Sequence, residues 1–166
     1  MSDLLFTIGD LVVFANILTL VLFIKLKCGS ESTLWALILL SFFNSSMHVW
    51  GYFLKSKFGI YDAVFMQHLW YLSYSVFHVF ALSFLLFIHR QKQIKASIFS
   101  LIVSGGFVII TMATISQYFS HTILEVKYPV VASMYQYCIP YVNICTAVSG
   151  FFALFAEKYS KRSFKC

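Results

Sequence analysis

Five long apolar segments, separated by short polar and charged connections, fill nearly all of the 166-residue sequence. Each segment reaches the roughly 20 residues that a helix needs to cross the hydrocarbon core of a bilayer. Strands of a membrane barrel would be shorter and would alternate in polarity, and in lipid the backbone must satisfy its own hydrogen bonds. The pattern predicts an all-α integral membrane protein, a bundle of five transmembrane helices over residues 4–26, 33–54, 61–88, 96–119 and 129–156.

The composition agrees with this pattern. Hydrophobic residues make up 60% of the chain and charged residues only 11%, whereas a soluble domain carries about 25% charged residues. The first segment is too long for a cleavable signal peptide and no basic residue precedes it. We expect one transmembrane domain over residues 1–166, in a plasma or bacterial inner membrane. Its surroundings are the lipid bilayer, and nucleic acid is not an expected partner.

The distribution of basic residues predicts the orientation. If the N-terminus lies outside, nine of the twelve lysine and arginine residues fall on the cytoplasmic side, where such residues concentrate. These nine are Lys25, Lys27, Arg90, Lys92, Lys95, Lys158, Lys161, Arg162 and Lys165. We interpret the last seven as a cytoplasmic basic anchor, and the C-terminus as cytoplasmic. Cys28 and Cys166 lie on the same side near the membrane and are candidates for lipidation.

Polar residues inside the spans are the candidate functional groups, because an ionisable side chain at depth is costly. At 1.5 Å per residue, most of them lie roughly 8–12 Å inside the outer boundary. Helical spacing places several on shared faces that point into the bundle. The predicted polar cavity consists of Asp10, Asn44, His48, Gln67, His68, Tyr71, His78, Gln117, Gln136 and Asn143. Pro140 removes a backbone donor and predicts a kink in the last helix.

Asp10 is the most informative of these residues, because it is the acid that lies well inside a predicted span. It could supply the charge of a functional cavity. The alternative is a structural hydrogen bond, with His48 as the partner and with the acid protonated because burial disfavours its charged form. His78 has a similar alternative as a hydrogen-bonded packing residue. Serine, threonine and asparagine side chains often only join helices to one another.

Two functions fit this arrangement best. In the first, an outward-facing polar cavity serves an ion, a proton or a small polar molecule, as in a channel, a transporter-like unit or a sensor. Five spans in 19 kDa are few for a complete carrier, so this alternative implies a homo-oligomer. In the second, the chain is a non-catalytic subunit that binds a partner membrane protein, as assembly, immunity or regulatory proteins do.

A third alternative is a b-type haem electron carrier, because His48 and His68 lie at similar predicted depth on consecutive helices. Otherwise no cofactor and no metal site is expected. An enzyme is not favoured: motifs such as GxSxG or HExxH are absent from the sequence, and we assign no catalytic residue. Ser45, Ser46 and His48 are close in sequence, but such pairs are too common to indicate a reaction.

Overall fold

The computed structural model describes residues 2–26, 29–126 and 128–163. This part of the chain is helical throughout its length, apart from short connections. The helices are α1 (Ser2–Leu26), α2 (Glu31–Lys57), α3 (Ala63–Lys92), α4 (Ile98–Tyr118), the short π-helix η1 (Phe119–Ile123) and α5 (Pro129–Ser163). Within the described ranges, five helices are long and apolar enough to cross a membrane. The predicted helical class and the predicted number of candidate spans are therefore confirmed.

The helices begin where side chains cap their free N–H groups. The side chains of Ser30, Asp62 and Ser97 accept hydrogen bonds from the backbone N–H three residues further on, at the starts of α2, α3 and α4. Such N-caps satisfy donors that have no partner inside the helix. Helix α3 ends at Gln93, whose φ of 53° places it in the left-handed conformation. Helix α2 and the ends of α3 and α5 extend past the predicted spans, whereas α3 and α4 begin two residues later than predicted, directly after their caps Asp62 and Ser97.

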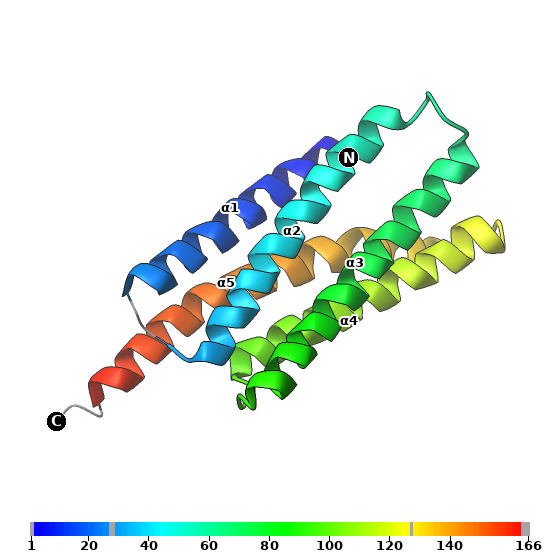
Figure 1. Cartoon of the computed structure of the whole chain (residues 1–166). Coiled ribbons are helices and arrows are strands. Elements are labelled where there is room, and N and C mark those ends of the chain that lie inside the picture. The colour runs from blue at the N-terminus through cyan, green and yellow to red at the C-terminus, as the bar shows by residue number, and fades with distance from the viewer. Residues whose placement is uncertain (1, 27–28, 127, 164–166) are drawn as a thin grey trace.

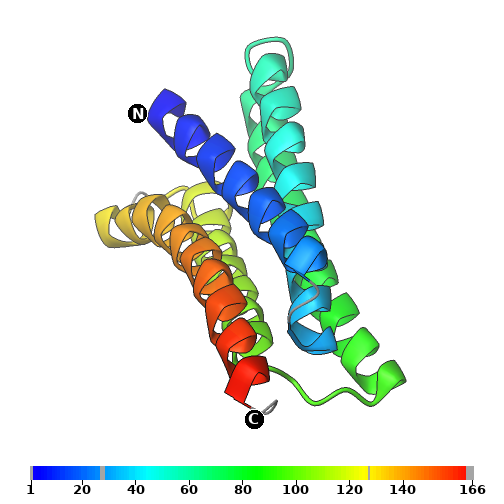
Figure 2. The same ribbon diagram turned by 90° about the vertical axis from the view of Figure 1, so that its left-hand side faces the viewer.

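Consecutive helices run antiparallel, as their short connections require (Figure 1). Helix α5 returns along the bundle and packs against both α4 and α1. We call the end that carries the chain start, the α2–α3 connection and η1 the N-end of the bundle, and the opposite end the C-end. Figure 2 shows α5 curving over its first half, the part that contains Pro140. A proline removes one backbone hydrogen bond and bends a helix at this kind of position.

The hydrophobic core lies in the half of the bundle toward the C-end. It is built by the last turns of α1 and α3, the first turns of α2 and α4, and the last third of α5. Its buried members are Phe23, Ala36, Leu37, Leu39, Leu40, Phe43, Ala81, Leu85, Ile88, Phe99, Val103, Phe107 and Leu154. Gly150 lets α5 approach closely, because a Cβ there would lie 3.2 Å from Phe99 and 3.3 Å from Leu37. This half of the bundle is therefore closely packed.

The outer surface of the bundle is strongly apolar. Large side chains such as Phe14, Val49 and Ile98 are more than half exposed. A soluble protein rarely shows large contiguous apolar surface, whereas lipid tails accommodate it. The surface thus suits the membrane environment that the length and composition of the helices indicate.

Candidate ligand-binding cavity

A cavity of about 510 Å³ occupies the half of the bundle toward the N-end. Its walls come from α1, α2, α3 and α5, with contributions from Phe58 and from His121 of η1. Most of the wall is apolar or aromatic, and the cavity is partly open. This size and lining are typical of small-molecule sites, which are concave, mostly apolar and equipped with a few polar groups. The hydrophobic core therefore occupies the half of the bundle toward the C-end, and the cavity occupies the half toward the N-end.

Seven of the ten predicted polar residues line this cavity. They are Asn44, His48, Gln67, Tyr71, His78, Gln136 and Asn143, and Pro140 lies beside them. The remaining predicted residues, Asp10, His68 and Gln117, are not among its lining residues. Helical spacing thus identified the inward-facing stripes of α2, α3 and α5. The inward face of α1 is marked instead by Asn16 and Thr19, which lie three residues apart and are both buried, and Asp10 lies outside that face.

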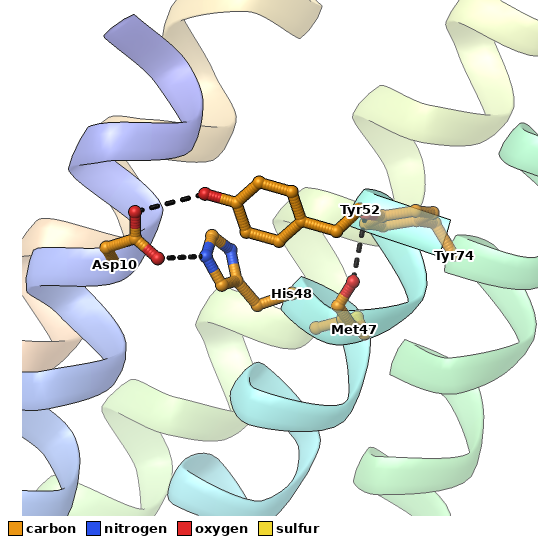
Figure 3. A network of polar contacts seen from close by, with 5 residues as sticks. All are labelled: Asp10, Met47, His48, Tyr52 and Tyr74. Atoms are coloured by element: carbon orange, nitrogen blue, oxygen red, sulfur yellow. Dashed lines mark hydrogen bonds and ion pairs between the residues drawn. The ribbon is translucent and has the colours of Figure 1, made fainter. Parts of the chain in front are cut away.

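Asp10 lies on the outside of the bundle, where it joins α1 to α2. Its Oδ1 lies 2.6 Å from His48 Nε2, and the Tyr52 hydroxyl donates to its Oδ2 at 3.1 Å (Figure 3). The Asp10 side chain is 56% exposed and that of His48 16% exposed. The hydrogen bond between Asp10 and His48, predicted as part of the structural alternative, is present. The burial that the same alternative assumed for Asp10 is wrong, because more than half of this side chain is exposed. Gly9 makes room for it, since a Cβ there would lie 2.7 Å from His48 Cε1.

An aromatic wall lines the cavity on the side of α3. Trp70 stacks on Tyr74 with ring centroids 5.0 Å apart and donates through Nε1 to the Tyr135 hydroxyl at 3.0 Å. The Tyr74 hydroxyl donates to the carbonyl of Met47 at 3.1 Å (Figure 3). These bonds tie α3 to α5 and to α2, so the wall is held in place from both sides. The rings themselves remain available for contact with an apolar ligand.

Two polar atoms at the base of the cavity have no hydrogen-bond partner. Asn44 is 6% exposed and His78 2% exposed. Among the described residues, nothing pairs with Nδ2 of Asn44 or with Nε2 of His78. Leaving a buried polar group unpaired costs about 1–3 kcal/mol. Both atoms are themselves buried, so they lie behind the wall of the cavity and not on its accessible surface.

His68 and Gln117 belong to a neighbouring region. His68 Nδ1 lies 2.8 Å from the Tyr118 hydroxyl of α4, and Gln117 lines a smaller cavity of about 280 Å³ near η1. The smaller cavity shares His121 and Gln136 with the larger one. His48 lines the larger cavity and His68 lines neither of the two, and the haem alternative stays a prediction. In the described part of the chain, no three His, Cys, Asp or Glu side chains come together as metal ligands would.

Sequence reasoning missed a polar network at the C-end of the bundle. Glu157 of α5 accepts hydrogen bonds from the backbone N–H of Ser30 and, at 3.1 Å, from the Ser30 hydroxyl. The Thr33 hydroxyl lies 2.5 Å from Glu157 Oε1 and 2.9 Å from Ser97 Oγ. The carboxylate therefore links α5 to the starts of α2 and α4. It was missed because Glu157 lies one residue beyond the predicted span and is not exceptional there.

His89 anchors the other side of this network. Its Nδ1 donates to the Leu85 carbonyl at 2.8 Å, so its Nε2 accepts from the buried Ser32 hydroxyl at 2.7 Å. The backbone N–H of Ser97 donates in turn to Ser32 Oγ at 2.8 Å. The serine and histidine side chains resemble a catalytic pair in type only. Ser32 is fully buried, so a substrate has no access to it, and the network is structural.

The predicted basic anchor lies at this same C-end. Arg90 and Lys95 are exposed, and Lys92 forms an ion pair with Glu31 at 2.6 Å. Lys158 is half-buried, and Lys161 and Arg162 lie in the last turns of α5. Lys165, together with Cys28 and Cys166, lies outside the described residues.

Comparison with known proteins adds no family to these observations. Neither a protein-family model, nor a curated protein, nor a solved structure matches this chain.

Proposed function

We propose that this chain is a membrane protein that binds a small amphipathic molecule in the N-end cavity, as a sensor or a transporter-like unit. The observation that carries the proposal is the cavity of about 510 Å³ itself, whose wall is mostly apolar and aromatic and also includes polar side chains such as Asn44, Gln67 and Gln136. The aromatic and aliphatic walls suit the apolar part of such a ligand, and the amide and imidazole groups suit its polar part.

The shape of the cavity favours binding over open conduction. Its lining residues reach no deeper than Asn44, His78 and Asn143. Beyond this level the core residues of every helix pack together, including Phe43 and Phe107. A channel would need a polar path through that half of the bundle. Buried polar side chains such as Asn16, Ser41 and Ser100 also lie in that half, but Phe43 and Phe107 are packed there, and the geometry therefore favours a blind site from which a ligand enters and leaves at the N-end.

Tryptophan fluorescence can test the proposal, because Trp70 lines the cavity. The full chain in lipid nanodiscs is titrated with 12-bromododecan-1-ol, an amphipathic molecule whose bromine quenches tryptophan. We expect saturable quenching that Trp70→Phe removes. The double variant Val13→Phe/Ile139→Phe fills the cavity and should weaken binding about tenfold or more, since binding depends on space for the ligand.

The matched control is Ile17→Phe/Ile144→Phe, which also introduces two phenylalanines, at exposed positions of α1 and α5. This variant should bind as the wild type does. Quenching that never saturates, or that both double variants retain equally, would contradict the proposal. The alternative of a non-catalytic subunit that binds a partner membrane protein stays a prediction, as does the homo-oligomer.

A further inference from the structure

A lysine lies at the end of the cavity toward the N-end, which we call its mouth. Lys55 lines the cavity and is exposed, and it lies two residues before α2 ends at Lys57. Its ammonium nitrogen lies 4.8 Å from the centre of the Phe6 ring, which also lines the cavity. A cation over the face of an aromatic ring is attracted to that ring, so this contact keeps the positive charge beside the mouth.

The wall of the cavity holds no acidic side chain to set against this charge. Among the described residues that line it, Lys55 is the only lysine or arginine, and none is aspartate or glutamate. Three histidines also line the cavity. His48 is bonded through Nε2 to Asp10, which lies outside the wall. The unpaired Nε2 of His78 and Nδ1 of His121 are buried, so these two atoms do not reach an occupant, and Lys55 is the charged group that it meets.

Below the mouth the wall of the cavity is mostly apolar and aromatic. Asn44 at the base precedes Lys55 by eleven residues of α2, which is about 16 Å along a helix. Over this depth the lining includes Val12 and Ile139, and two of its tyrosine hydroxyls already bond to other groups of the protein. A narrow space of about 510 Å³ beneath a positive charge suits one apolar chain with an anionic head.

We propose that the ligand is a long-chain carboxylate, which enters chain first and leaves its charged head at Lys55. A carboxylate only accepts hydrogen bonds, and an ammonium group only donates them. Lys55 takes part in other contacts as well, but its three donors allow a carboxylate to join them. The amides of Gln67 and Gln136, near the starts of α3 and α5, also line the cavity and add donors to its wall. This inference rests on the proposed function and names the ligand class for the same cavity.

Two probes of matched chain length test the role of the head group. They are 12-bromododecanoate and the uncharged 12-bromododecan-1-ol, each read by quenching of Trp70 in phosphatidylcholine nanodiscs at about pH 9, where carboxylic acids are ionised. Lys55→Met removes the charge and keeps an unbranched side chain. We expect it to weaken binding of the carboxylate about fivefold, as the loss of one exposed ion pair does, and to leave binding of the alcohol unchanged. Each probe partitions equally into the lipid around wild type and variant, so their ratio isolates the site.

The matched control is Lys57→Met, which removes the same charge from the same end of α2. Lys57 is not among the residues that line the cavity, and its ammonium nitrogen lies 5.6 Å from the centre of the Phe53 ring instead. This variant should bind both probes as the wild type does. An equal loss of carboxylate binding in Lys55→Met and Lys57→Met would show that only the general charge of this end matters, and would overturn the assignment to Lys55.

The remaining outcomes separate this inference from the proposed function. Saturable quenching by both probes without any effect of Lys55→Met overturns the long-chain carboxylate but leaves the cavity a binding site. Absence of saturable quenching by either probe overturns the inference and the proposed function together. Nanodiscs that contain phosphatidylglycerol distinguish a free carboxylate from a lipid head group. Competition by this anionic lipid that Lys55→Met removes would place a lipid phosphate at the mouth and overturn the free carboxylate, whereas unchanged carboxylate binding supports it.

Discussion

At the residue scale, His48 connects the cavity to the outer surface of the bundle. Its ring lines the cavity, while its Nε2 is bonded to Asp10, which points from α1 toward α2 (Figure 3). The same ring lies edge-on to Tyr52, with centroids 4.9 Å apart. The His48 side chain therefore joins α2 to α1 and also forms part of the cavity wall. A change that displaces this ring should affect the contact between the two helices and the shape of the cavity.

Gly9→Ala provides such a change, because its Cβ would lie 2.7 Å from His48 Cε1. We expect the ring to shift, the bond to Asp10 to weaken, and the variant to lose about 1 kcal/mol of stability. The measurement is the thermal unfolding temperature in detergent. Gly105→Ala is the control, since nothing lies within 4 Å of the added Cβ, and alanine should be neutral or stabilising in that helix. If Gly9→Ala and Gly105→Ala have the same unfolding temperature, the His48 ring does not pack against Gly9 as the structure shows.

At the scale of the helices, Glu157 determines how α5 meets the starts of α2 and α4. Its carboxylate accepts the backbone N–H of Ser30 and contacts the Thr33 hydroxyl, so it stabilises the N-terminus of α2 as a negative group should. Glu157→Gln places an amide that can donate, rather than only accept, opposite these donors. We expect a loss of about 1–3 kcal/mol in the free energy of unfolding, typical of an unsatisfied hydrogen-bonded charge site.

The control for Glu157 is Glu31→Gln, which also removes one negative charge at the C-end. Glu31 pairs with Lys92 at an exposed position, and exposed ion pairs contribute little. The unfolding temperature in detergent should therefore fall much further for Glu157→Gln than for Glu31→Gln. A similar small fall in the unfolding temperature of Glu157→Gln and Glu31→Gln would show that only the loss of one negative charge matters. The hydrogen bonds of Glu157 would then not hold the helices together.

The elements also show which features the sequence could predict. Long apolar segments identify the helices because the bilayer fixes their length, and polar stripes identify the inward faces of α2, α3 and α5. Asp10 escaped this reasoning, since a lone acid in an apolar helix does not reveal whether it faces the bundle or the outside. Asn16 and Thr19, three residues apart on one face of α1, are also buried, and their spacing could have identified the inward face of that helix. Glu157 gains its role only from Ser30 and Thr33, more than 120 residues earlier in the chain.

At the scale of the whole molecule, the bundle combines a packed half with a hollow half. The core toward the C-end holds the helices together and is closed at its end by the hydrogen bonds of Glu157 and His89. The N-end half is free of that constraint, so the bend in α5 (Figure 2) and the spacing of α1 leave room for a cavity. This division lets one end carry stability and the other carry binding. The side of the membrane that the N-end faces then decides which compartment supplies the ligand.

The basic residues predict that the N-end lies outside, because they concentrate at the C-end. The prediction can be tested with single cysteines in a background in which the four native cysteines are replaced. Ser56→Cys lies at the N-end and Gln91→Cys at the C-end, and both native side chains are exposed. In intact cells, a membrane-impermeant maleimide should label Ser56→Cys and not Gln91→Cys. After the membrane is dissolved in detergent, both should react, which controls for accessibility of the thiols.

The opposite labelling pattern would reverse the orientation without altering the cavity, and the ligand would then come from the cytoplasm. Labelling of both positions in intact cells would place both ends on one side. Such a result is incompatible with helices that cross the bilayer, because Ser56 and Gln91 lie at opposite ends of antiparallel neighbours. If only Ser56→Cys is labelled, a ligand reaches the cavity from the external face, and the cavity extends inward to Asn44 and His78, about 20 Å below that surface.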